Sequence, residues 1–338
     1  MDGISSRGDS PIVHFVSVII PNRNGGSTIG ACLKAAFATQ NVDFEVIVVD
    51  DFSDDDSIDV IEQFPCRIVR LTSHSGAAKA RNTGAQHSKG DILFFTDADC
   101  LLQEDTVTRA CAVLGASETP LVVGGTYTLE PADPRFFSRF QSVFIHYSET
   151  KHASDPDYIA SHAMAMTADT FRQSGGFSES QRPILEDVEL SHRIRRQGVQ
   201  LLIDPNIQVR HFFNFSLLGS LQNAMRKSMY WIIYSLGNGD LLADSGTASL
   251  ELKANVVSYF FSLLCLLISV STSQIGWLVF AIAALIVNIV INRQLLLAFY
   301  RTGGILFFLG ATLYYLGLYA LPVGLGGVAG AIRYRRDS

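Results

Sequence analysis

The stretch Gly90-Asp-Ile-Leu-Phe-Phe-Thr-Asp-Ala-Asp-Cys100 joins an apolar run to two carboxylates that are separated by one residue. The apolar run is typical of a buried strand, and side chains in an extended segment repeat their direction every second residue. Asp97 and Asp99 are therefore expected to point to the same side. Carboxylates held this close repel each other and form a hard-oxygen site suited to Mg²⁺ or Mn²⁺. The alternative is a helix cap with a solvated turn, where Asp is also favoured.

Further apolar runs precede this stretch and alternate with helix-like segments. We expect strands over residues 16–20, 44–49, 67–71 and 91–96, and helices over residues 28–39, 57–63, 77–87 and 104–114. The alternation predicts an α/β fold, Rossmann-like, with a mostly parallel sheet and flanking helices. In such sheets ligands bind at the carboxyl ends of the strands. The polar residues expected there include Asn24, Asp50, Asp51, His74 and the Asp97/Asp99 pair.

The chain is less regular after Val123, where Pro131, Pro134, Pro156 and Pro183 interrupt it. A helix is expected again over residues 186–197 and a short strand over residues 199–203. We assign this half to specificity rather than to nucleotide binding.

Charge and cysteine content exclude several classes of function. The net charge of −6 argues against nucleic acid as the main partner. The five cysteines are scattered, odd in number and form no Cys-x-x-Cys pair, which indicates a reduced compartment and no zinc site. Cys100, beside the carboxylates, is expected to be a small buried residue rather than a nucleophile.

Two long stretches near the C-terminus contain no charged residue, namely residues 254–292 and 302–332. A membrane span needs about 20 apolar residues, so the first stretch can hold two spans and the second one. The alternative is a buried helical hairpin of a soluble core. The preceding segment, Phe215–Leu236, suits a helix lying in the membrane interface, with a linker or core helix as the alternative.

The topology prediction follows from the charges that flank these stretches. The polar start of the chain, residues 1–10, lacks the apolar run of a secretory signal, so we expect a cytoplasmic catalytic domain. Two spans return Arg293 and Arg301 to the cytoplasm, as positive-inside bias prefers. A third full crossing would place the basic tail outside. A break at Pro322-Val323-Gly324 would instead allow a hairpin that keeps the tail inside, and we favour the hairpin.

Several motifs, in order along residues 16–211, resemble the family-2 glycosyltransferases of the GT-A fold. They are Val16-Ser-Val-Ile-Ile-Pro21 with Asn24, Glu45-Val-Ile-Val-Val-Asp-Asp51 with Ser53, Ala80-Arg-Asn82 with Gly84, Asp97-Ala-Asp99, Gly175-Gly-Phe177, and Glu186-Asp187 followed by Leu190 and Arg193. Each motif alone is modest evidence, and the ordered set is strong.

The resemblance implies a nucleotide-sugar site, with a UDP- or GDP-linked donor. The expected nucleotide-sugar residues are Pro21, Asn24, Asp50, Asp51, Arg81 and Asp97. Asp50 and Asp51 suit hydrogen bonds to base and ribose, or alternatively a turn before the next helix. Asp97, Asp99 and His211 would hold a divalent metal, Mg²⁺ or Mn²⁺.

The resemblance also places the acidic pair Glu186-Asp187 on the acceptor side. Asp187 would be the general base that takes a proton from the acceptor hydroxyl. The alternative is that both acids only open the helix that follows, where negative charge is stabilising, and both roles can hold at once.

Two departures from the family pattern narrow the expected activity. Many relatives carry an Asn near the segment Ser161–Met166, which has none here. Processive members carry Gln-x-x-Arg-Trp after the acidic pair, and Gln222-Asn-Ala-Met-Arg226 has the wrong spacing. We therefore expect a non-processive enzyme.

The expected protein is a membrane-anchored inverting glycosyltransferase. It would move one sugar to a polyprenyl or lipid-linked acceptor at the cytoplasmic face of the plasma (inner) membrane, as a multi-pass protein. A processive polysaccharide synthase and a non-catalytic nucleotide-sugar-binding scaffold are the alternatives. We divide the chain into an N-terminal tail (1–14), a GT-A domain (15–212), interfacial helices (213–250), a transmembrane region (251–334) and a basic tail (335–338).

Overall fold

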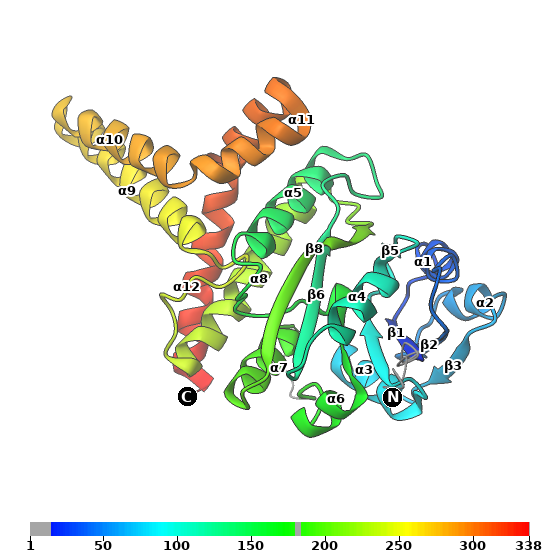
Figure 1. The fold of residues 1–338 in the computed structure, drawn as a ribbon. Helices are drawn as coiled ribbons and strands as arrows, with labels where there is room; N and C mark the ends of the chain where they lie inside the picture. Colours follow the sequence, from blue (N-terminus) through cyan, green and yellow to red (C-terminus); the bar gives the residue numbers. More distant parts are fainter. Residues whose placement is uncertain (1–14, 180–183, 338) are drawn as a thin grey trace, which may run out of the picture.

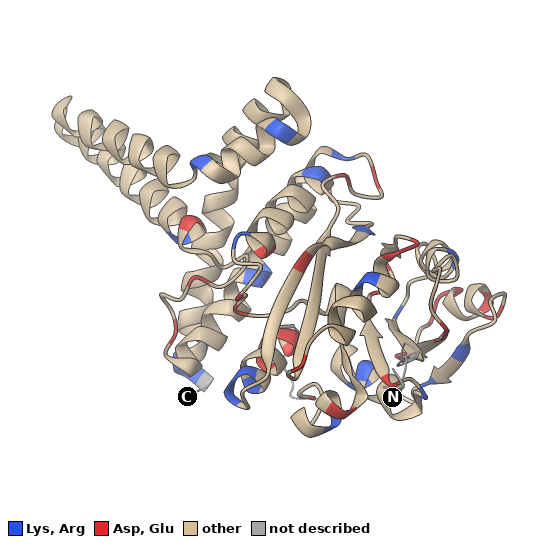
Figure 2. Ribbon diagram, in the orientation of Figure 1, with Lys and Arg blue, Asp and Glu red and all other residues tan. Residues whose placement is uncertain are grey.

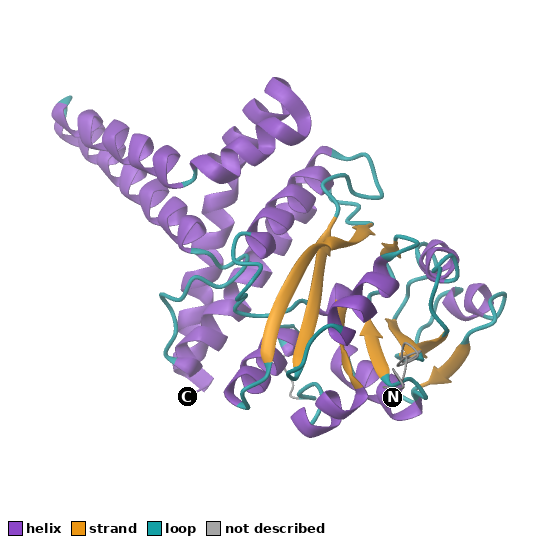
Figure 3. Cartoon of the chain, viewed as in Figure 1, coloured by secondary structure: helices purple, strands orange, loops and turns teal. Residues whose placement is uncertain are grey.

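The computed structural model describes residues 15–179 and 184–337, so the predicted tail over residues 1–14 lies outside the described residues. The described chain forms one eight-stranded sheet with helices against it, followed by long C-terminal helices (Figures 1 and 3). The strand order is β3-β2-β1-β4-β7-β6-β8-β5. The strands are β1 (Val16–Asn22), β2 (Phe44–Asp50), β3 (Arg67–Arg70), β4 (Ile92–Phe95), β5 (Cys100–Leu102), β6 (Leu121–Tyr127), β7 (Met164–Thr167) and β8 (Gln200–His211).

The first half of the sheet is parallel, as its sequence predicts. β1 pairs in parallel with both β2 and β4, and β2 pairs in parallel with β3. Every residue of β4 is buried, which agrees with its continuous apolar run. The intervening helices are α1 (Ile29–Ala36), α2 (Ser57–Ile61), α3 (Ala77–His87) and α4 (Thr106–Gly115).

The second half is mixed, so the expected mostly parallel sheet is only partly correct. β7 is antiparallel to β4 and to β6, and β5 is antiparallel to β8. The short strand predicted over residues 199–203 is the start of the longer β8. The register of β8 on β6 shifts near Pro205, which has no backbone N–H to donate, and the apolar pattern is broken there.

The helices of this half are α5 (Phe136–Thr150), α6 (Ala168–Ser174) and α7 (Glu186–Arg196), with a short 3₁₀ turn η1 (Ser161–Ala163). The helix predicted over residues 186–197 is confirmed as α7. α5 is not evident from the sequence, because Pro131 and Pro134 obscure its start. It is nevertheless central to packing, since Phe140 and Phe144 belong to one apolar cluster with both the sheet and the C-terminal helices.

The C-terminal helices are α8 (Leu217–Asn238), α9 (Leu250–Thr272), α10 (Gly276–Ile291), α11 (Arg293–Leu313), the π-helical turn η2 (Tyr314–Tyr319) and α12 (Ala320–Asp337). α9 and α10 form a hairpin that projects from the body (Figure 1) and is almost free of charged residues (Figure 2). Among the described residues, two helical stretches are long and apolar enough to cross a membrane: Leu250–Thr272 and Arg293–Arg336. α10, with 16 residues, is shorter than the second span expected within residues 254–292.

The chain reverses at a different place from the one that its sequence suggested. Within the range of α11, Gly304 has φ 67° and ψ −165°, and the helix breaks there, as only glycine does without strain. Pro322, where the break was expected, lies inside helical structure. The π-helical turn η2 comes just before it, and such a turn re-routes backbone hydrogen bonds that a proline cannot complete.

Four polar side chains connect the hairpin to the rest of the C-terminal helices. The amide of Asn255 donates to the carbonyl of Tyr315 (2.8 Å), and that of Asn288 donates to Asn255 Oδ1 (2.8 Å). The amide of Asn292 donates to Asn288 Oδ1 (2.8 Å), and the Tyr315 hydroxyl donates to Asn292 Oδ1 (2.9 Å). All four residues are buried, so this closed set of bonds fixes one arrangement of α9, α10 and η2.

α12 packs closely along α8 through glycines. A Cβ atom at Gly326 would lie 2.3 Å from the Met225 carbonyl oxygen, and one at Gly330 would lie 2.4 Å from that of Met229. Small residues spaced four apart let two helix backbones approach this closely. A Cβ at Gly327 would meet only ordinary contacts, the nearest at 3.6 Å.

We predict that Gly330→Ala destabilises the protein by about 1–3 kcal/mol, because its methyl group collides with the backbone of α8. Thermal unfolding in detergent measures the change. Gly327→Ala is the matched control, and it should be neutral or stabilising because Ala is the better helix former. Equal effects of the two substitutions would contradict the packing described.

Candidate active site

The predicted polar residues meet at the carboxyl ends of β1, β2 and β4. Asp50 ends β2, and its Oδ1 accepts from the Asn22 amide (2.9 Å) and the Ser53 hydroxyl (2.6 Å). Its Oδ2 accepts from the Ser53 backbone N–H (3.1 Å). Asp50 therefore connects β1 to the turn after β2, which is the turn role considered for it above. Its contact with a nucleotide stays a prediction.

Asp51 holds the loop that leads into α3. Its Oδ1 accepts from the Ser75 N–H (2.6 Å), and its Oδ2 accepts from the Gly76 N–H (2.8 Å) and lies 2.7 Å from His74 Nδ1. The side chain is buried. Asp51 thereby fixes Gly76, which has φ 91°, at the start of the helix that carries Arg81.

Pro21 and Asn24 flank the end of β1. Pro21 is the next-to-last residue of β1 and pairs with Val49 of β2. Asn24 has a positive φ of 50°, and its Oδ1 accepts from the Asp54 N–H (3.0 Å). Both residues lie at the edge of the sheet that their motif predicts, while their contact with a nucleotide sugar stays a prediction.

Arg81 joins the two acidic parts of the site. Its Nη2 donates to Asp97 Oδ1 and its Nη1 donates to Glu186 Oε1, each at 2.7 Å. The guanidinium is almost fully buried and also lies over the Phe177 ring. Burial disfavours its charge, but the two carboxylates outweigh that effect and raise the pKa of Arg81; in return Arg81 holds the pKa of Asp97 below its usual range. The motifs around residues 81, 97 and 186 are thus one cluster.

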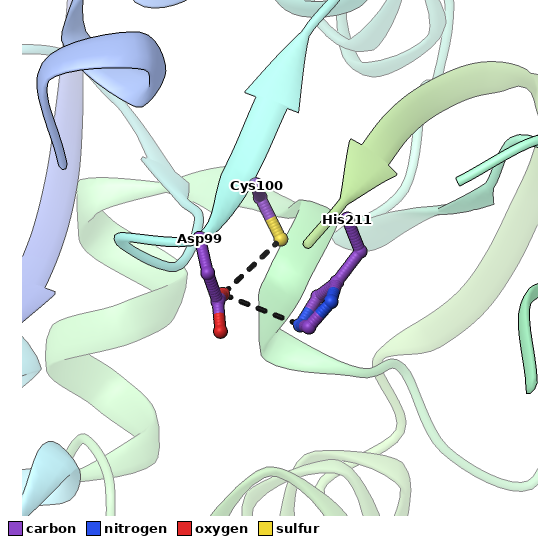
Figure 4. A group of neighbouring side chains, drawn as sticks. All are labelled: Asp99, Cys100 and His211. Atoms are coloured by element: carbon purple, nitrogen blue, oxygen red, sulfur yellow. Dashed lines mark hydrogen bonds and ion pairs between the residues drawn. The ribbon is translucent and has the colours of Figure 1, made fainter. Parts of the chain in front are cut away.

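Asp99 and His211 lie close together, away from the contact of Asp97 with Arg81. Cys100 pairs with His211 across the antiparallel β5–β8 ladder, which brings the imidazole beside Asp99. His211 Nε2 lies 3.3 Å from Asp99 Oδ1, and Figure 4 shows these side chains pointing toward one another together with Cys100. One ligand atom from each of the three lies within 4.8 Å of the other two.

This donor set fits a divalent metal. Asp99 offers a half-exposed carboxylate and His211 a ring nitrogen, donors that Mn²⁺ and Mg²⁺ accept. Cys100 fits less well, because burial and the two nearby carboxylates raise the pKa of its thiol. Its packing, with no exposed surface, agrees with the buried residue predicted from the sequence. Asp97 directs one oxygen to Arg81 and lies outside the three-residue cluster.

Asp187 lies at the start of α7, next to Glu186. Its Oδ2 accepts from the Ser161 N–H (3.1 Å) and its Oδ1 from the Val188 N–H (2.9 Å). Burial and the neighbouring Glu186 raise the pKa of Asp187 to about 6. A carboxyl group with a pKa in this range can accept a proton near neutral pH.

Three buried residues near the metal cluster were not identified from the sequence as site residues. Glu149 accepts from the Thr126 hydroxyl (2.7 Å), and burial raises its pKa to about 8. His162 Nε2 lies 3.7 Å from Glu149, and burial lowers the pKa of the imidazole to about 3. Tyr127 stacks on His162 at 3.9 Å and packs edge-on against His211 at 5.0 Å. Only the pattern of a polar residue in an apolar segment, such as His162 before β7, could have indicated them.

Comparison with known proteins agrees with this geometry. Residues 17–171 match the family model described as glycosyl transferase family 2. The match covers a little under half of the chain, 155 of 338 residues. The family-2 match includes Asp50, Asp51, Arg81, Asp97 and Asp99, and it ends before α7.

Curated relatives match parts of this chain. An uncharacterized glycosyltransferase of Haemophilus influenzae is 40% identical over 94 residues, 27% of this chain and 31% of that protein. Glycosyltransferase AglE of Haloferax volcanii is 32% identical over 135 residues, 38% of this chain and 44% of that protein. The matched stretches thus span about a third to a half of the relatives' length.

A solved structure shares the fold over nearly the whole chain. The mannosyltransferase PcManGT from Pyrobaculum calidifontis, in complex with GDP-Man and Mn²⁺, aligns with a TM-score of 0.58 at 20% identity. The alignment covers 96% of this chain and 88% of that chain. The likeness shows an α/β, GT-A-like fold, and it extends to the C-terminal helices.

We predict that Glu149→Gln changes the pH dependence of stability. The folded-state pKa of about 8 lies above the ordinary value of 4.5, so folding favours the protonated form; this contribution is present at low pH and is lost as the pH rises toward 8. Glutamine stays uncharged and can still accept from Thr126. The variant should match the parent protein near pH 4.5 and exceed it by about 1–3 kcal/mol at pH 8.

Thermal unfolding at a series of pH values measures this difference. Glu104→Gln, on the exposed surface, is the control and should leave the pH dependence unchanged. A parallel pH dependence for Glu149→Gln and the parent protein would contradict the assigned burial effect.

Proposed function

We propose that this protein is an inverting glycosyltransferase that moves one sugar from a nucleotide-sugar donor to a membrane-associated acceptor. The observation that carries the proposal is the double ion pair of Arg81, with Asp97 on one side and Glu186 on the other, at 2.7 Å each. It supports a single site in which donor-side and acceptor-side acids face each other. The family-2 match and the glycosyltransferase relatives support the same reaction class.

On the donor side, Asp50, Asp51, Asn24 and Pro21 would surround the nucleotide at the ends of β1 and β2. Arg81 and Asp97 would bound the sugar diphosphate. Asp99 and His211 would hold Mg²⁺ or Mn²⁺, with Asp97 close to it, and a bound divalent ion would neutralise charge on the leaving diphosphate. A GDP- or UDP-linked donor is proposed, and the likeness to a GDP-Man- and Mn²⁺-bound mannosyltransferase favours this class.

On the acceptor side, Asp187 would take the proton from the attacking hydroxyl. That oxygen forms a bond to the anomeric carbon while the bond to the diphosphate breaks, so the nucleoside diphosphate leaves with the electron pair. Glu186, bound to Arg81, would keep the start of α7 in position beside the donor. Backbone donors on both oxygens of Asp187 would orient it.

We further propose that the C-terminal helices anchor the protein in the plasma (inner) membrane, with residues 15–212 as a cytoplasmic catalytic domain. The apolar exposed surfaces of α9 and α10 support this, with Val257 68% exposed and Val279 64% exposed. α8 and the loop after it, residues 213–250, would lie in the interface. Single-sugar transfer to a polyprenyl or lipid-linked acceptor follows, with a processive synthase as the alternative.

We predict that Asp99→Asn abolishes transfer of labelled sugar to membrane lipids in the presence of Mn²⁺, because the substitution removes a charged ligand. Incorporation of label into the lipid extract measures it. Asp105→Asn, an exposed position paired with Arg109, is the matched control and should retain activity. Full activity of Asp99→Asn would refute the metal assignment.

We predict that the rate at subsaturating acceptor, kcat/KM, rises with pH through about 6 and levels off above it. The base must be deprotonated to act, and the pKa of Asp187 is about 6. Asp187→Asn should lower the rate by about 10²–10⁴-fold and remove this rise. A variant that keeps the rise would show that another group titrates.

A further inference from the structure

A cavity of about 420 Å³ lies between α5, α8, α9 and α12, beside the proposed acceptor side of the site. Its walls are mostly apolar, and they include Phe144, Trp231, Ile232, Leu252, Val256 and Val323. Two further wall residues, Val257 and Val328, are 68% and 60% exposed. The cavity therefore opens onto the apolar outer surface of the C-terminal helices.

Two lysines line this cavity, Lys227 and Lys253, and the Lys253 ammonium donates to the Ala243 carbonyl. Lys227 of α8 has an exposed side chain at the wall of the cavity, and desolvation by the neighbouring protein lowers the pKa of its ammonium. The carboxylates of Asp187, Glu149 and Asp97 lie near enough to oppose that effect. Within residues 15–179 and 184–337, no ion pair or hydrogen bond is formed by the Lys227 ammonium. The Lys227 ammonium is thus a charge between the proposed acceptor-side acids and the apolar cavity.

A buried side-chain amide faces the same cavity. Gln141 of α5 lines it and is only 2% exposed. Its Oε1 atom has no hydrogen-bond partner in the described part of the chain. Buried amides are normally satisfied, and an amide can offer either its carbonyl or its N–H₂ group to a ligand.

We propose that this cavity binds the hydrocarbon chain of a single-chain lipid phosphate, and that the Lys227 ammonium binds the phosphate beside Asp187. The inference rests on the proposed function and names the acceptor class of that same site. The charge of Lys227 complements an anionic head group, and Gln141 supplies a polar partner near it. Lys227 binds one phosphate oxygen, and the attacking hydroxyl beside Asp187 is then the P–OH group of the same phosphate.

The size of the cavity fits one chain. A water occupies about 30 Å³ of liquid and a methylene group takes up a similar volume, so the cavity holds roughly 14 such groups, about three isoprene units. A longer chain would continue over the apolar surface at Val257. The raised pKa of Glu149 leaves that carboxyl mostly uncharged at neutral pH, which reduces repulsion of a phosphate.

Trp231 reports on the cavity directly. The chain has two tryptophans, so a Trp277→Phe background leaves Trp231 as the only one. In detergent, farnesyl phosphate should change the Trp231 fluorescence saturably. It should bind at least about tenfold more tightly than farnesol, because only the phosphate can form a charged hydrogen bond with the Lys227 ammonium. Inorganic phosphate alone should give no change, because it lacks the chain.

Substitutions separate the two parts of the proposed site. Lys227→Met should weaken farnesyl phosphate about tenfold and leave farnesol unchanged, and Lys227→Arg should restore most of the preference. Arg226→Met, on the preceding residue of α8 and outside the cavity wall, is the matched control and should keep the preference. Ala248→Phe, which fills the cavity, should weaken both ligands.

Equal binding of farnesyl phosphate and farnesol to the parent protein, or an unchanged preference in Lys227→Met, would overturn the proposal. This binding assay uses no sugar donor and no turnover. A failure here therefore leaves the tests of Asp99 and Asp187 intact, and a failure of those tests leaves this one intact.

Discussion

The rest of the site depends on one buried cation. Arg81 comes from α3, and its two partners come from the turn after β4 and the start of α7, which are far apart in the sequence. A buried charge is tolerated only when its partners stay in place, so each carboxylate constrains the other through the guanidinium. The loop before α3 is fixed in turn by Asp51, which binds the Ser75 and Gly76 backbone. These contacts thus connect the end of β2 to the start of α7.

α5 performs the same connecting function for the apolar parts of the molecule. Its Phe140 and Phe144 pack against Tyr314, Tyr315 and Tyr319, and the same helix carries Glu149 toward the site. The C-terminal helices are consequently not an appendage on a flexible linker. Together with α5 they line the apolar cavity that also contains Lys227.

The sequence predicts the parallel half of the sheet well, because its strands are continuous apolar runs bounded by polar turns. The expectation that Asp97 and Asp99 point to the same side of an extended segment is wrong, because both lie in the turn between β4 and β5, where Asp97 binds Arg81 and Asp99 lies beside His211. The second half of the sheet is harder to predict from the sequence, because β8 alternates and shifts its register near Pro205 and because α5 follows two prolines. The roles of Arg81 and Glu149 depend on contacts across more than 20 residues of sequence, which periodicity alone does not contain. Proline at 322 suggested a break, but the turn falls at Gly304, where φ is positive.

The π-helical turn η2 has a consequence for the angular register of the C-terminal segment. Such a turn accommodates about one residue more than regular α-helix does, and each residue of a helix turns the following face by about 100°. With the extra residue, Tyr315 faces Asn292 while Gly326 and Gly330 face α8. Without it, one of these two contacts would point away from its partner. The π-helical turn thus allows one segment to make two contacts at once: the hydrogen bond of Tyr315 to Asn292, and the close packing of Gly326 and Gly330 on α8. A regular α-helix over the same residues would direct these two contacts differently.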